Sequence, residues 1–95
     1  MNIKRIANNN DLADYLQQLG AQLRSCDRFD AAERTLFASQ FATGSASEFL
    51  FEAEEALKVV HRSCADVLSE VEIAQVVRVL KQIREAFDQV GGVGE

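Results

Sequence analysis

Apolar side chains recur every three or four residues along most of the chain, which is the spacing of one face of an α-helix. The most regular stretch is 69–90, where six apolar residues form one seam: Ile73, Val76, Leu80, Ile83, Phe87 and Val90. Ser69 and Glu72 have the spacing of a capping box, and two glycines follow the last apolar residue. The pattern predicts a helix whose apolar stripe is too broad for a single neighbouring helix to cover.

The same spacing predicts three earlier helices, separated by short polar segments. The four expected helices span about residues 10–25, 29–43, 46–66 and 70–90. A chain of 95 residues has room for one domain of this kind. We therefore expect an all-α, antiparallel four-helix bundle over residues 10–90, with the last helix the most buried, a flexible arm over 1–9 and a flexible tail over 91–95.

Several residues stand where they are expected to start a helix or to admit a neighbour. Asn10 or Asp11 can cap the first helix. For the second, Asp30 with Glu33 has the spacing of a capping box, and Asp27 is an equally good cap. Gly20 falls in the middle of the first helix, where glycine costs about 1 kcal/mol relative to alanine. We expect this glycine to let the backbone of another helix approach closely.

The first two helices resemble one tetratricopeptide-type hairpin. The positions that carry the resemblance are Leu16, Leu19, Gly20, Leu23, Phe29, Ala32 and Leu36. A repeat array needs the same pattern at a fixed period, and about 34 residues further on the key positions hold Ala53, Glu54 and Asp66. The resemblance therefore implies an antiparallel helical hairpin and no binding function.

The charge balance bears on the partners that the chain can have. Fifteen acidic residues stand against ten basic ones, a net charge of −5, whereas nucleic acids and anionic membranes are bound through Lys and Arg. No apolar run has the length of a membrane span. Cys26 and Cys64 both fall on apolar seams, where a free cysteine packs as a small hydrophobe in a reducing compartment. We expect a cytoplasmic protein that binds neither nucleic acid nor membrane.

The residues that could support catalysis or metal binding are few. His61 and Cys64 are three residues apart, which is half of a zinc site, but Cys26 is the one other soft ligand and there is no second histidine. Nucleophilic catalysis needs a nucleophile, a base and an orienting group that converge. We expect no metal, no cofactor and no enzymatic activity; an active site shared between two subunits near His61 is the form of catalysis that this reasoning leaves open.

Acidic residues crowd the first half of the third helix. They are Glu48, Glu52, Glu54 and Glu55. Basic residues follow in its second half, an order that complements the helix dipole. The acidic residues have two interpretations: a solvated face, or a surface that recognises a basic partner, as in a small inhibitor of the antitoxin or immunity type.

Some apolar residues lie away from the helical seams. The set comprises Phe37, Phe41, Phe51 and Val59. Either the four helices wrap around a wider core than a heptad plot indicates, or these side chains form an interface. Our leading hypothesis is a non-enzymatic protein-interaction module that forms a homodimer through the second and third helices, with another protein as a further candidate partner. The acidic inhibitor is the alternative.

Overall fold

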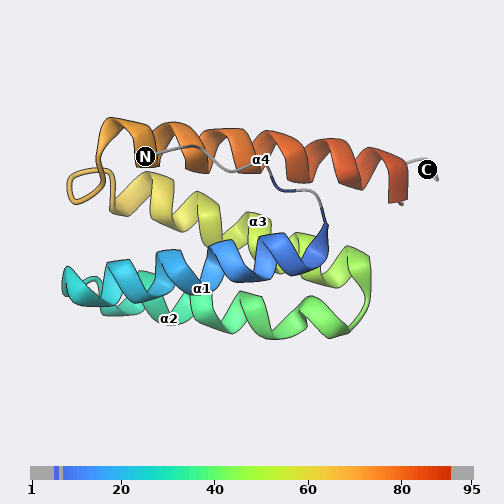
Figure 1. Ribbon diagram of the computed structural model, residues 1–95, viewed down its shortest axis with the longest axis horizontal. Helices are drawn as coiled ribbons and strands as arrows, with labels where there is room; N and C mark the ends of the chain where they lie inside the picture. Colours follow the sequence, from blue (N-terminus) through green and yellow to red (C-terminus); the bar gives the residue numbers. More distant parts are fainter. Residues whose placement is uncertain (1–5, 7, 91–95) are drawn as a thin grey trace.

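The structure is a computed structural model in which residue 6 and residues 8–90 are described. Its elements are α1 (Asn9–Ser25), α2 (Phe29–Ser39), the short 3-10 helix η1 (Gln40–Thr43), α3 (Ala46–Ser63) and α4 (Glu70–Val90). Successive helices run in opposite directions and are joined by short connections (Figure 1), and the described residues contain no strand. The expected all-α fold of four helices is confirmed. The expected arm over 1–9 and tail over 91–95 lie almost entirely outside the described residues.

Two of the expected helix boundaries are wrong. The second expected helix does not continue as an α-helix to residue 43, because α2 ends at Ser39 and tightens into the 3-10 turn η1. The third ends at Ser63 rather than at residue 66. Leu68 lies in the connection that follows and is buried in the core before α4 begins.

The capping box expected at the start of α4 is present in both directions. The backbone N–H of Glu72 donates to Ser69 Oγ at 3.1 Å, and the backbone N–H of Ser69 donates to Glu72 Oε1 at 2.7 Å. The second oxygen of this carboxylate accepts a 2.6 Å hydrogen bond from Gln22 Nε2 of α1. Glu72 therefore starts α4 and also ties it to α1.

The starts of the first two helices differ from expectation. Asn8, rather than Asn10 or Asp11, caps α1, since its Oδ1 accepts a hydrogen bond of 2.8 Å from the backbone N–H of Asp11. The capping box expected from Asp30 and Glu33 is absent, because the N-cap of α2 is Arg28, which makes no side-chain capping bond. The tight connection between α1 and α2 determines where α2 begins.

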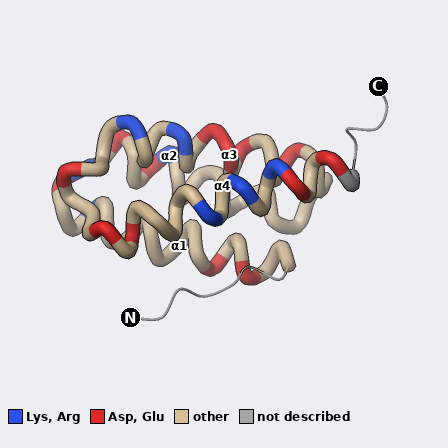
Figure 2. Tube along the Cα trace, turned by 90° about the horizontal axis from the view of Figure 1, so that it is seen from above, with Lys and Arg blue, Asp and Glu red and all other residues tan. Residues whose placement is uncertain are grey.

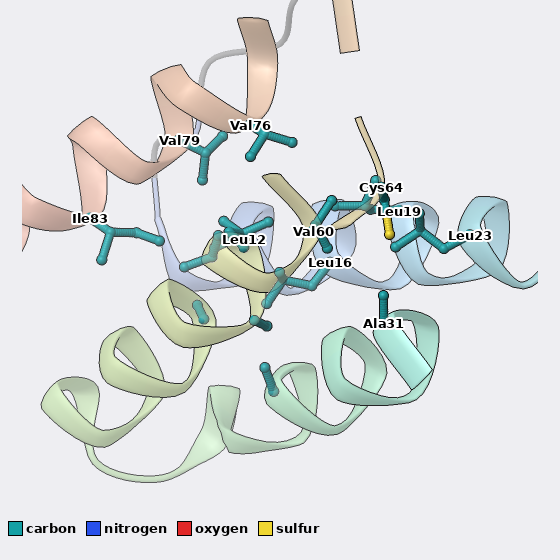
Figure 3. Close-up of a cluster of buried hydrophobic side chains, with 14 of the residues drawn as sticks. Leu12, Leu16, Leu19, Leu23, Ala31, Val60, Cys64, Val76, Val79 and Ile83 are labelled. Atoms are coloured by element: carbon teal, nitrogen blue, oxygen red, sulfur yellow. The ribbon is translucent and has the colours of Figure 1, made fainter. Parts of the chain in front are cut away.

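Helix α3, not α4, is the most buried helix, which corrects our expectation. It contributes five fully buried apolar residues: Phe49, Ala53, Ala56, Leu57 and Val60. It packs against both α2 and α4. Helix α4 contributes Val76, Val79 and Ile83 to the core (Figure 3), while Val77, on the flank of its stripe, is exposed. The flank of the apolar stripe of α4 is therefore left uncovered, although α4 meets both α3 and α1.

Helix α2 turns small side chains toward the interior. Its buried residues are Ala31, Ala32, Thr35, Ala38 and Ser39. Small residues allow two helix backbones to lie close together, and Gly20 of α1 faces this side of α2. A Cβ built at Gly20 would lie 2.6 Å from Cγ and Cδ2 of Leu36 and 3.4 Å from the backbone carbonyl oxygen of Ala32. The expectation that Gly20 admits a neighbouring backbone is confirmed.

Candidate interaction surface

The two phenylalanines of α2 lie outside, because its small residues occupy the inside and Leu36 is half-buried against Gly20 of α1. Phe29 is 51% exposed and Phe37 is 49% exposed. Of the three α2 positions that carry the tetratricopeptide resemblance, Ala32 is buried, Leu36 is half-buried and Phe29 is exposed. A heptad plot gives phenylalanine more weight than alanine as a core residue. It therefore misses a buried face on which small side chains let two helices pack closely.

Phe37 and Phe41 form one aromatic pair at the end of the α2 segment. Their ring centroids are 5.1 Å apart and their planes make an angle of 80°, an edge-to-face contact. Phe41 belongs to η1 and is half-buried against the core. Its ring supports Phe37, whose outer side remains in solvent.

Helix α3 carries the other two residues of the expected interface. Phe51 is 50% exposed, whereas Val59 is half-buried and packs against the core. Eight residues separate them, which turns Val59 about 80° around the helix from Phe51. Phe37 and Phe51 are therefore the solvent-exposed members of the set, and Phe41 and Val59 lie at its inner margin.

An ion pair joins the segments of α2 and α3 that carry the exposed phenylalanines. Arg34, one turn before Phe37, reaches Glu52, which directly follows Phe51, with Nη2 and Oε1 2.9 Å apart. Both side chains are largely buried. We call the surface formed by Phe37, Phe41, Phe51 and Val59 around this ion pair the α2–α3 face.

The four glutamates of the expected acidic surface do not share one environment. Glu52 pairs with Arg34, and Glu54 is only 8% exposed and lies 3.3 Å from Arg84 of α4. Glu55 makes an exposed pair of 3.6 Å with Lys58, and Glu48 is exposed. Two of the four carboxylates thus connect α3 to its neighbours, Glu52 to α2 and Glu54 to α4.

The residues considered for metal binding are separated by their exposure. His61 is exposed, whereas Cys64 is buried in the cluster that also contains Leu19 and Leu23 (Figure 3). Cys26 is half-buried at the end of α1. Across residues 6 and 8–90, no three His, Cys, Asp or Glu side chains gather into a group that could hold a metal ion.

A cavity of about 150 Å³ lies between the start of α1, the start of α3 and the second half of α4. Leu12, Leu50 and Val79 form part of its apolar wall, and Asn8 and Gln82 add amide groups. None of its described lining residues is titratable or nucleophilic. His61 is not among the described residues that line the cavity.

Tyr15 and Glu72 form a polar contact region between α1 and α4. Hydrogen bonds from the backbone N–H of Ser69 and from the side chain of Gln22 lower the pKa of Glu72. Burial, and then the negative charge of Glu72, raise the pKa of Tyr15 far above its usual value. The Tyr15 side chain is half-buried. Its environment keeps it protonated and does not make it reactive.

Comparisons with known proteins do not assign the chain to a family. No family model matches it, and neither a curated protein nor a solved structure is significantly similar to it. Within the part of the chain that the structure describes, none of the helices has the length and apolar character needed to cross a membrane. Any function has to be inferred from the surface of the protein, and above all from the α2–α3 face.

Proposed function

We propose that this protein is a non-enzymatic interaction module that self-associates through the α2–α3 face. The observation that carries the proposal is the position of small and large side chains on α2. Alanines and other small residues fill its inner face, while Phe37 on its outer face leaves half of its surface in water. Phe51 does the same on the adjacent helix. Aromatic residues are enriched at interfaces because they bury a large area at low conformational cost.

The dimensions of the molecule are compatible with a dimer of standard size. Its principal extents are 39, 23 and 21 Å, so one long side presents roughly 800–900 Å² in projection. A stable interface buries about 800 Å² on each partner. A second copy can use the same face in a two-fold arrangement, which is the commonest symmetry of protein dimers.

The first test is the mass of the protein in solution. Size-exclusion chromatography with light scattering should give twice the chain mass of 10.5 kDa. Phe51→Glu should return the protein to the monomer, because a charge placed at an aromatic anchor costs 2 kcal/mol or more, roughly a 30-fold or greater weakening. A wild-type protein that stays monomeric from micromolar to near-millimolar concentration would refute the proposal.

Phe29→Glu is the matched control. Phe29 has the same exposure as Phe51 but lies at the start of α2, two turns before Phe37 and about 80° away around the helix. The same substitution there adds the same charge outside the α2–α3 face. It should leave the dimer intact, and equal disruption by both variants would count against this face.

The acidic inhibitor remains a second, less supported proposal. It needs carboxylates that are free to meet a basic partner, yet Glu52 and Glu54 already pair with Arg34 and Arg84. A salt-dependent complex with a basic protein that is lost on changing Glu48 would favour it over self-association.

A further inference from the structure

The outermost residues of α3 form a second, solvent-facing row. Glu48, Phe51, Glu55, Lys58 and Arg62 are spaced by three, four, three and four residues, and all are exposed except Glu55, which is half-exposed. This is the spacing of a helix–helix packing seam. We call these five residues the α3 outer row.

The charges of the α3 outer row change sign along the helix. Glu48 and Glu55 lie on the N-terminal side and Lys58 and Arg62 on the C-terminal side; the acidic and basic stretches can be followed along α3 in Figure 2. Two such rows in parallel would place acid against acid and base against base. Two antiparallel rows place acid against base at both ends, and the row is then complementary to itself.

The existing ion pair within the row does not oppose this rearrangement. Glu55 and Lys58 are 3.6 Å apart and both side chains are more than 40% exposed. An exposed pair of this kind contributes little to stability. Its two members are therefore available to a second copy, unlike Glu52 and Glu54, which are engaged inside the bundle.

We infer, on the basis of the proposed self-association, that two copies pair their α3 helices antiparallel about a two-fold axis between Glu55 and Lys58. In this arrangement Glu55 faces Lys58 of the second copy, and Phe51 faces Arg62 of the second copy, whose guanidinium can lie over the aromatic ring. The pairing is made by the two α3 helices, and the exposed Phe37 of α2 belongs to the same α2–α3 face.

Charge reversal tests the orientation of the two helices. Lys58→Glu with Arg62→Glu makes the row wholly acidic, and Glu48→Lys with Glu55→Lys makes it wholly basic. Each variant alone should dimerise at least about tenfold more weakly than the wild type, and an equimolar mixture of the two should form a heterodimer of near wild-type affinity. Far-UV circular dichroism and thermal melting of each variant verify that α3 still folds.

The net charge of the variants provides an internal control. Each double reversal changes the net charge by four, from −5 to −9 in the acidic variant and to −1 in the basic one. General repulsion would weaken the acidic variant and strengthen the basic one. If both variants dimerise more weakly and their mixture regains wild-type affinity, the cause is the local contacts of the α3 outer row and not the net charge.

Cross-linking gives a second readout that tolerates a weakened dimer. In a Cys26→Ser background, with Cys64 buried, Glu48→Cys alone should not cross-link through a short bismaleimide, because its two copies lie about 25 Å apart along antiparallel helices. A mixture of Glu48→Cys and Arg62→Cys chains should cross-link efficiently. Self-cross-linking of Glu48→Cys would show parallel helices and overturn the inference.

The outcomes separate this inference from the proposed function. A monomeric wild type overturns both. A wild-type dimer that Phe51→Glu disrupts, but that the two charge-reversed variants form as well as the wild type, supports self-association and overturns the antiparallel pairing of the α3 outer row.

Discussion

The contact between Gly20 and Leu36 leads to a prediction about the sign of a stability change. Alanine in a helix interior is favoured over glycine by about 1 kcal/mol. The added methyl group of Gly20→Ala would lie 2.6 Å from Cγ and Cδ2 of Leu36 and 3.4 Å from the carbonyl oxygen of Ala32. Carbon atoms in contact prefer a separation of about 3.5–4.0 Å, so α1 and α2 must move apart or Leu36 must change rotamer.

The magnitude follows from these two opposing terms. Overpacking of one methyl group costs about 1–3 kcal/mol, which exceeds or cancels the gain in helix propensity. Gly20→Ala should therefore lower the free energy of unfolding by about 0–2 kcal/mol. In a Leu36→Ala background the obstructing atoms are gone, and Gly20→Ala should raise the free energy of unfolding by about 0.5–1 kcal/mol.

The assay is a double-mutant cycle by urea denaturation, followed by far-UV circular dichroism at one protein concentration. The coupling between the two positions should be about 1–3 kcal/mol, with little change in the dependence of the free energy on urea. Equal effects of Gly20→Ala in the two backgrounds would refute the close approach of α1 and α2 at this point.

Two further predictions concern pH. Tyr15 is the single tyrosine of the chain, so absorbance near 295 nm should show it ionising well above pH 10 in the folded protein and close to pH 10 in urea. Because burial raises the pKa of Tyr15 in the folded state, its contribution to stability should be complete below pH 10 and should fall above it. A folded-state titration near pH 10 would contradict the burial of Tyr15. The folded pKa of Glu72 is lowered by the N–H of Ser69 and the side chain of Gln22, so its contribution should be present above about pH 4.5 and lost as the pH falls below it. The difference in urea midpoint between wild type and Glu72→Gln should accordingly shrink between pH 7 and pH 3, and a constant difference would exclude the ionised carboxylate as its source.

The start of α4 was predicted correctly from the sequence, because it depends on residues that are neighbours along the chain. The capping box of Ser69 and Glu72 depends on a three-residue spacing, and both of its hydrogen bonds form. The four-helix fold likewise follows from apolar spacing. The capping box predicted from Asp30 and Glu33 failed because α2 begins at a point determined by its connection to α1.

The burial of side chains and the partners of ion pairs depend on which helices meet, and they could not be predicted from spacing along the chain. Ala31 and Ala38 are buried and Phe29 is exposed because α2 lies close to its neighbours, and apolar spacing contains no information on that distance. The partners of Glu52 and Glu54 are arginines on different helices, so their spacing within α3 predicted one acidic face where the structure divides it. The exposure of Phe37 and Phe51 agrees with the expected interface set, whose role in binding stays a prediction.

The unequal burial of the helices has a consequence for how the molecule opens. Helix α4 contributes three fully packed residues, and the polar tie to α1 lies at its first turn, through Glu72 and Gln22. Ile73, Leu80, Ala86 and Phe87 pack partly against the core, and Arg84 pairs with Glu54 of α3. Because α4 has fewer fully buried residues than α3, we expect its amides to exchange with deuterium sooner than those of α3. A dimer formed through the α2–α3 face should therefore slow the exchange of α3 more than that of α4.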